Sequence, residues 1–471
     1  MNINDFIHKI FEIKSVEEFN TLALQAFEYQ RENCAVYKEY LELTGRLNLT
    51  PKSPFEIPFL PIRLFKTRDV VTTLPATSAQ SAKGVRISGT PQAKNAQNAK
   101  GVRIFGTPQA PSTSSSVPGV PVFGTPGTKK AQNVPGVRKT GTPGTPVTFT
   151  SSATTGMVPS HHIVQDISIY EQSFRNAFHH FYGENFNLLA LLPSYLEREG
   201  SSLVYMADAL IKEAQQKGNT GGFFLYNHQE LLSTLQTLSE KNSSTLTKNL
   251  NKFSLSKRPN NQKTILLGVS FALLDFAAFI KQQIPEKKER EQLFRNVIIM
   301  ETGGMKGRGK ELSRSELHSI LSDAFSTAIH SEYGMCELLS QAYSFPLNNS
   351  NTIFAATDNK ARIQQNDISE TGIFSTRPWM QVVIRDLQDP FKILSLDKSQ
   401  ATEGGVSKEV LVGGINVIDL ANIGSCCFIE TEDRGTIYSS ATTTPHTIHP
   451  KFTVDGRIKN SELRGCNMLI E

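Results

Sequence analysis

Short apolar runs alternate with amphipathic segments between residues 188 and 325, and this alternation constrains the fold more than any other feature. Apolar runs at 188–192, 223–226, 265–269 and 297–300 predict strands. The segments over about 203–216, 229–240, 271–283 and 313–325 predict the helices that follow them. A repeated strand–helix unit gives parallel strands covered by helices, so we predict an α/β fold with mostly parallel sheets. Beyond Trp379, apolar runs at 382–384, 415–418 and 427–429 predict a strand-rich C-terminal part.

A low-complexity segment over residues 75–146 interrupts the chain. AKGVRISGTPQAKNAQN begins at Ala82 and a near copy begins 17 residues later, at Ala99. A second pair of repeats begins at Val117 and Val134, again 17 residues apart. The repeats are rich in Gly, Pro and Thr and lack the apolar period that stacked units need, so we predict a disordered insertion.

The insertion divides the chain into three parts. Residues 1–74 form an N-terminal part, which we expect to be helical over 4–46 and extended over 57–66. Residues 147–471 form the main α/β region. Because the insertion splits one domain, its two ends should be neighbours in space. The polar stretches 241–262 and 347–370 are expected to be surface insertions.

Charge and cysteine content exclude several classes of protein. The net charge is +5, but the segment between Val70 and Val147 holds nine Lys and Arg and no Asp or Glu. The remainder therefore carries −4, which argues against nucleic acid as a partner. Five cysteines without a CxxC pair favour a reducing cytoplasm. Cys426 and Cys427 are expected in the core, and Cys34 in the core or on a helix surface. The longest apolar stretch, 264–280, is too short to predict a membrane span.

Residues 148–156, TFTSSATTG, form the first motif whose residue types suit ligand binding. Six of these nine residues are Ser or Thr, and the run closes on a Gly. Hydroxyl and backbone N–H donors in a short turn suit a polyphosphate. Runs of this composition are also common in loops without a ligand, so composition alone leaves both interpretations open.

Further motifs follow in order along the chain. They are VIIMETGGMKG at 297–307, HSEYGMCE at 330–337, TEDRG at 431–435, and GR at 456–457 followed by ELRGC at 462–466. Together with TSSATTG and the segment IPFLPIRLFKT before the insertion, they resemble the acyl-protein synthetase (LuxE-type) family of the adenylate-forming, acyl-CoA synthetase-like superfamily. The resemblance covers about residues 50–74 and 147–471, and it implies the adenylate-forming fold, without the full C-terminal small domain of acyl-CoA synthetases.

The resemblance also implies roles for individual residues. The expected ATP-binding residues are Thr150, Ser151, Ser152, Thr154, Thr155, Gly156, Gly303, Gly304, Tyr333, Gly334, Met335, Asp433 and Arg457. The loop would cradle the phosphates, Tyr333 would stack on adenine, and Asp433 would bind the ribose hydroxyls. Glu337 would hold Mg²⁺, which prefers oxygen ligands. Taken singly, Tyr333 also fits a core aromatic, and Glu337 a carboxylate at the start of a helix.

Cys466 is the expected acyl acceptor. A thiolate is a suitable nucleophile toward an acyl adenylate, and RGC matches the setting of the family's acyl-accepting cysteine. Cys466 could equally be a small apolar residue of a final strand. The implied enzyme is an ATP-dependent acid–thiol ligase that activates a carboxylic acid, by resemblance a fatty acid. It would load the acyl group onto Cys466 or onto a partner reductase or transferase.

Two other functions are compatible with the sequence. The segment SHHIVQD contains an HHxxxD pattern, in which His162 and Asp166 could serve an ATP-independent acyltransferase. The chain could also be an inactive scaffold whose nucleotide site was disrupted by the insertion.

Overall fold

The computed structural model describes residues 1–74, 146–151, 158–193, 200–250, 262–303, 312–345, 372–395, 410–438 and 451–458. The predicted insertion at 75–146 and the polar stretch 347–370 lie outside these ranges, apart from Pro146. Residues Met1–Pro75 and Gly141–Glu471 belong to one compact unit, which is the subject of all that follows. The division of the chain into three parts stays a prediction.

Three helices form the N-terminal part, as predicted: α1 (Ile3–Ile10), α2 (Val16–Asn33) and α3 (Ala35–Leu43). The segment 57–66 is only partly extended. Leu60–Pro61 forms the short strand β1, whereas Ile62–Lys66 forms a 3-10 helix. The 3-10 spacing puts Ile62 and Phe65 on one side of the chain, and both are buried, which explains the departure from an extended strand.

The N-terminal part is joined to residues near the end of the chain. β1 pairs in parallel with β13 (Phe428–Tyr438), with Leu60 opposite Ile429. The buried amide of Gln30 donates to the carbonyls of Asn422 and Ile423 and accepts from the Cys427 N–H at 2.8 Å. These bonds satisfy buried backbone groups that would otherwise be costly, so α2 is an integral part of the core.

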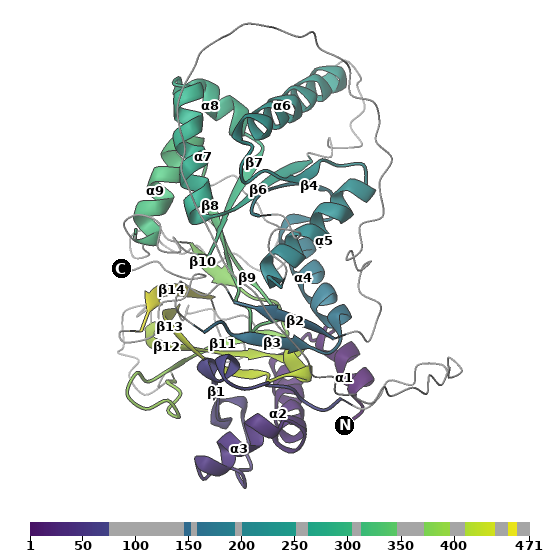
Figure 1. The fold of residues 1–471 in the computed structure, drawn as a ribbon, viewed down its shortest axis with the longest axis vertical. Helices are drawn as coiled ribbons and strands as arrows, with labels where there is room; N and C mark the ends of the chain where they lie inside the picture. Colours follow the sequence, from purple (N-terminus) through teal and green to yellow (C-terminus); the bar gives the residue numbers. More distant parts are fainter. Residues whose placement is uncertain are drawn as a thin grey trace, which may run out of the picture. The chain divides into compact units, whose positions relative to one another are not determined.

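Parallel strands form one half of the main sheet, as the alternation predicted. The order is β5 (Gly221–Phe223), β4 (Phe186–Leu191), β6 (Lys263–Val269), β7 (Val297–Thr302) and β8 (Ile329–Tyr333), all parallel. The helices α4 (Ile167–Tyr182) and α5 (Ser202–Gln216) lie on one side of these strands in Figure 1, and α7 (Ser270–Gln283) and α9 (Arg314–Phe325) on the other.

Two helical details differ from the sequence prediction. α6 (His228–Leu250) continues beyond residue 240, because residues 241–250 contain no Gly or Pro to stop it. Residues 251–261 of that polar stretch lie outside the described ranges. α8 (Lys287–Phe294) was not predicted, because its sequence KKEREQLF is mostly charged and only Arg290, Leu293 and Phe294 are buried.

Antiparallel strands complete the sheet, and they confirm the strand-rich C-terminal part. β9 (Ala342–Phe345) pairs with β8, and the order continues through β10 (Ile373–Ser375), β14 (Lys451–Arg457), β13, β12 (Val410–Asp419) and β11 (Met380–Arg385). With β1, twelve strands of the described residues make one sheet, while β2 (Val147–Thr150) and β3 (His161–Val164) form a separate hairpin. The fold is therefore α/β, as predicted, and its main sheet joins a parallel half to an antiparallel half.

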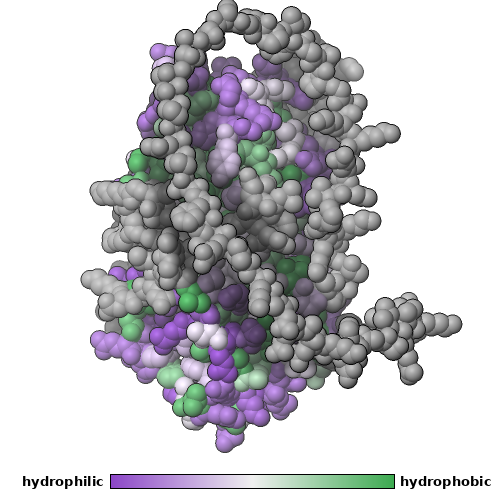
Figure 2. Space-filling model, in the orientation of Figure 1, coloured by the Kyte–Doolittle hydropathy of each residue, from purple (hydrophilic) through white to green (hydrophobic). Residues whose placement is uncertain are grey.

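The surface and core follow the usual partition of side chains. Cys426 and Cys427 are fully buried, as predicted, and Cys34 is in the core rather than on a helix surface. Figure 2 shows hydrophilic residues over much of the described surface at the two ends of the face in view. No helix in the described part of the chain is long and apolar enough to cross a membrane.

Candidate functional site

A cavity of about 680 Å³, open to solvent, lies at the carboxyl ends of the parallel strands. Its wall includes Leu192 after β4, Val269 at the end of β6, Thr302 at the end of β7, and Gly334 after β8. β4 and β6 are neighbours, but the chain leaves β4 toward β5 on the other side before it returns to β6. Ligands of open α/β sheets bind at such a reversal of strand order, so this cavity is the candidate site.

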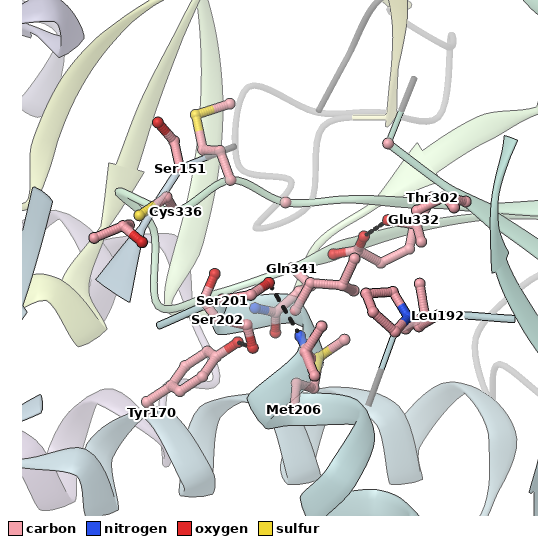
Figure 3. Close-up of a pocket in the computed structure, with 18 residues that line it drawn as sticks. Ser151, Tyr170, Leu192, Ser201, Ser202, Met206, Thr302, Glu332, Cys336 and Gln341 are labelled. Carbon is pink, nitrogen blue, oxygen red and sulfur yellow. Dashed lines mark hydrogen bonds between the residues drawn. The ribbon is translucent and has the colours of Figure 1, made fainter. Parts of the chain in front are cut away.

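The first turn of α5 forms another part of this wall. Ser202, Leu203 and Val204 line the cavity, and Ser201 caps the helix by accepting from the Val204 N–H. The partial positive charge of a helix N-terminus favours an anionic group at this place. Figure 3 shows Ser201 and Ser202 between Gln341 and Tyr170, whose hydroxyl donates to the Ser202 carbonyl at 3.0 Å.

The expected phosphate loop begins at the rim of this cavity. Thr150 and Ser151 line it, and they end strand β2. The Ser151 N–H donates to the Ser160 carbonyl at 3.0 Å, and the Ser160 N–H donates to Ser151 Oγ at 2.8 Å. These two bonds bring both ends of the loop together. Ser152, Thr154, Thr155 and Gly156 lie outside the described residues, as do Gly304 and Cys466.

Gly303 also lines the cavity, directly after β7. Its φ of +69° is in the left-handed region, where a side chain is strained, so the conformation itself favours Gly. Its carbonyl accepts a hydrogen bond of 3.0 Å from Ser270 Oγ at the start of α7. The chain can thus turn sharply at the cavity edge.

The end of β8 separates two clusters of polar residues. Side chains alternate along a strand, so Glu332 and Tyr333 point to opposite faces. Glu332 lines the cavity together with Gly334 and Met335, whereas Tyr333 does not. A ligand that spans both faces would pass over Gly334 and Met335.

The second cluster joins Tyr333, Asp433 and Arg457. The Tyr333 hydroxyl donates to Asp433 Oδ2 at 2.9 Å, and Arg457 contacts Asp433 Oδ1 at 3.1 Å. The structure therefore brings together three residues that lie up to 124 positions apart in the sequence. The Tyr333 side chain is 1% exposed, and its ring lies 5.9 Å from the rings of Phe374 and Phe452. The expected stacking of this ring on adenine stays a prediction.

Glu337 and His162 interact electrostatically in the interior. Both are buried, and the charge of Glu337 acts on His162. His162 Nδ1 lies 2.8 Å from the Cys336 carbonyl, so this nitrogen donates and Nε2 carries the lone pair. Burial lowers the pKa of His162 to about 4, although the Cys336 carbonyl and Glu337 oppose this, so the ring is neutral at pH 7.

The HHxxxD pattern is not assembled as an acyltransferase pair. Asp166 caps α4, where its Oδ1 accepts from the Ser168 N–H at 3.0 Å and from Ser168 Oγ at 2.7 Å. His162 is 1% exposed and bonds to Cys336 instead. A general base must reach its substrate, and neither geometry provides for that.

The carboxylates near the cavity determine whether Mg²⁺ can bind there. Among the described residues, no three His, Cys, Asp or Glu side chains gather as a metal cage. Glu337 directly follows Cys336, which lines the cavity. Glu337 itself is 1% exposed and is not among the described residues of the cavity wall. Mg²⁺ usually takes one or two carboxylates together with substrate phosphates, so a site for it at Glu337 stays a prediction.

The sequence interpretation missed Glu332, Thr302 and Gln341, which all line the cavity. Burial raises the pKa of Glu332 to about 7; the Thr302 hydrogen bond opposes the shift and the nearby Glu301 charge adds to it. Glu301 is buried as well, but bonds and charges from His318, Arg314 and Ser331 outweigh burial and lower its pKa. The sequence signal that could have identified Glu332 is its position at the end of an apolar strand, one residue before Tyr333.

Comparison with known proteins gives matches only among solved structures. No protein family and no curated protein sequence matches the chain. ATP-bound MatB from Rhodopseudomonas palustris is 13% identical, over 66% of this chain and 47% of that one, with a TM-score of 0.37.

Two ligases are similarly distant. A malonyl-CoA ligase in complex with methylmalonyl-CoA and AMP is 12% identical, over 70% of this chain and 57% of that one, with a TM-score of 0.38. A 2-hydroxyisobutyryl-CoA ligase in complex with 2-HIB-AMP and CoA is 10% identical, over 68% and 59%, with a TM-score of 0.38. The chain spans about half the length of these proteins, and similarity at this level carries no argument about activity.

Proposed function

We propose that this protein activates a carboxylic acid with ATP to form an acyl adenylate. The observation that supports this most is the shared end of β8. It joins a cavity bordered by Thr150 and Ser151 to the Tyr333–Asp433–Arg457 cluster on the other face. Acid activation needs a place for the acid and a place for the nucleotide that adjoin at the reacting atoms, and in this proposal the nucleotide binds at the cluster.

In this proposal the residues share the work of binding and charge neutralisation. Asp433 accepts hydrogen bonds from the ribose hydroxyls, and the loop from Thr150 binds the phosphates. A carboxylate oxygen of the acid forms a bond to the α-phosphorus of ATP, while the bond from that phosphorus to the pyrophosphate oxygen breaks. Mg²⁺, held by Glu337, would neutralise phosphate charge when bound.

The finer proposal is an acyl-protein synthetase of the LuxE type. The thiolate of Cys466 attacks the carbonyl carbon of the adenylate, a thioester forms and AMP leaves. The acyl group would then pass to a reductase or transferase. The sequence motifs support this step, whereas Cys466 lies outside the described residues.

The intact mass of the protein tests both steps. The protein is incubated with Mg-ATP and a panel of carboxylic acids, and pyrophosphate release is measured in parallel. The proposal expects an ATP-dependent gain of one acyl group that hydroxylamine removes. Cys466→Ser should abolish the gain, while Cys34→Ser, a change at another cysteine, should keep it. Pyrophosphate release without a mass gain would retain acid activation and refute Cys466 as acceptor. Absence of both in every sample would refute the proposed function.

A further inference from the structure

Two buried hydrogen-bond acceptors lie in the wall of the cavity, and nothing in the proposed activation chemistry uses them. Glu332 is 7% exposed and Gln341 is 4% exposed, and both line the cavity. Figure 3 shows the two side chains next to one another, with the hydrogen bond from Thr302 to Glu332 as a dashed line. A buried polar group is costly unless a partner satisfies it.

The Glu332 carboxylate has one oxygen available to a ligand. Its Oε2 accepts from Thr302 Oγ1 at 2.5 Å. Within the described ranges, no hydrogen bond joins Oε1 to another residue. Gly334 leaves the space for this oxygen, since a Cβ atom at Gly334 would collide with Oε1.

The Gln341 amide has an available acceptor as well. Its Oε1 is buried and has no hydrogen-bond partner in the described part of the chain. Its Cγ would lie 3.4 Å from the same Cβ position at Gly334, so both acceptors flank one small region of the wall. Burial without a partner is rare for such a group, and a ligand that donates a hydrogen bond would supply the missing partner.

The remaining wall provides the apolar contacts for a short chain of carbon atoms. These contacts come from Leu192, Val204, Met206 and Val269. The α5 N-terminus and Thr150 line the same cavity. The carboxylate of a ligand is favoured at the helix N-terminus, while its donor group binds the two acceptors.

We infer that the substrate acid carries a hydrogen-bond-donating hydroxyl or amino group, which binds Glu332 Oε1 and Gln341 Oε1. This inference rests on the proposed function and replaces a plain fatty acid by a polar-substituted one. An alkyl chain would leave the buried Gln341 Oε1 without a partner, whereas a donor group pairs with it and with Oε1 of the ionised Glu332 carboxylate. Sites built in this way reject analogues that lack the donor.

Matched acids test the inference with the full-length protein. Straight-chain acids of four to ten carbons are compared in three forms, with a terminal methyl, hydroxyl or amino group. Acid-dependent ATP–pyrophosphate exchange gives kcat/KM for each. The inference expects at least about a tenfold preference for a hydroxyl- or amino-bearing acid over the methyl acid of equal length. The hydroxyl and amino forms, compared with each other, identify which donor is used.

Variants connect the preference to the two acceptors. Glu332→Leu and Gln341→Leu should each reduce the preference by about tenfold or more, mainly by lowering kcat/KM for the donor-bearing acids. Met206→Leu changes another residue of the wall without changing its polarity, and should leave the ratio between the acids unchanged. Binding of the same acids by calorimetry without ATP provides a readout that does not require turnover.

The outcomes separate the inference from the proposed function. If every methyl acid supports exchange with a kcat/KM equal to or higher than that of the donor-bearing acids of equal length, the inference is overturned. Acid activation is then retained. A Glu332→Leu variant that alters the KM for ATP but not the preference among acids would also overturn it, because these acceptors would then serve the nucleotide. If no acid supports exchange, the proposed function fails. In that case calorimetry tests the inference by itself. If the donor-bearing acids do not bind, the inference is overturned.

Discussion

Substitution of Glu332 by Gln should make the protein more stable at neutral pH, by an amount that grows with pH. The ordinary carboxyl pKa of 4.5 is raised to about 7 in the folded chain. Below pH 4.5 the group is protonated in both states. As the pH rises toward 7, the unfolded chain releases its proton while the folded chain keeps it, so wild-type stability falls. A shift of about 2.5 pKa units corresponds to about 3 kcal/mol.

Glu332→Gln removes this penalty and keeps the shape of the side chain. Its amide oxygen can still accept from Thr302, so the change is confined to the ionisable proton. We expect the free energy of unfolding of the variant, relative to wild type, to rise by about 3 kcal/mol between pH 4.5 and 7.5. The other titrating groups are common to both proteins and cancel in this difference.

Urea unfolding at a series of pH values measures the effect. Trp379 is the only tryptophan, is 1% exposed and contacts the ring of Phe11 at 4.9 Å, so its fluorescence reports on the core. Circular dichroism in the same samples checks that secondary structure is lost in the same transition. A difference between variant and wild type that stays flat, or that shrinks as the pH rises, would refute the reasoning.

Glu301→Gln is the matched control with the opposite sign. Glu301 and Glu332 lie on adjacent strands, and Thr302 is the register partner of Glu332. The pKa of Glu301 is lowered, because the His318 bond and Arg314 charge outweigh burial. A carboxylate of this kind stabilises the fold above pH 4.5, and this stabilisation is lost as the pH falls through its folded pKa. Glu301→Gln should therefore have a lower free energy of unfolding than wild type at pH 7. The difference between the two proteins should become smaller as the pH falls.

Three further changes test the site. Gly334→Ala should displace the Glu332 carboxylate and lower kcat/KM for donor-bearing acids, in the exchange assay, by about tenfold, with a smaller effect on methyl acids. Gly303→Ala should cost about 1 to 2 kcal/mol in urea unfolding, because φ is +69°; an unchanged midpoint would contradict the left-handed conformation. Asp433→Asn should weaken ATP binding in calorimetry by about tenfold or more, since it removes the charge paired with Arg457; unchanged affinity would exclude Asp433 from the nucleotide site.

Local periodicity was sufficient to predict much of the fold. The strands β4, β6 and β7 each contain a continuous apolar run because helices cover both faces, and such runs are recognisable without knowledge of their partners. The antiparallel half was predicted as strands but not as part of the same sheet, because β8–β9 pairing depends on contacts between distant segments. The 3-10 helix after β1 was missed for a related reason, since burial of Ile62 and Phe65 overrides their preference for strands.

The candidate site was predictable where residue type alone limits the chemistry. The hydroxyl-rich turn pointed to Thr150 and Ser151, and the family resemblance pointed to Gly303; all three line the cavity. Glu332 was missed because its significance depends on burial and on the neighbouring Gln341, neither of which can be read from the chain. Likewise, the bond between Tyr333 and Asp433 joins residues 100 positions apart.

The attachment of α2 to residues near position 425 has a consequence for synthesis on the ribosome. Gln30 is made 392 residues before the Asn422 carbonyl that it binds. At about 5 to 20 residues per second, the helix waits on the order of 20 to 80 s for this partner. During that interval Phe27 of its apolar face lacks the ring of Phe428, which it faces in the folded chain at a centroid distance of 6.4 Å. Early exposure of this face makes the nascent chain a candidate client for chaperones that bind hydrophobic segments, and slower translation of the last third would prolong that dependence.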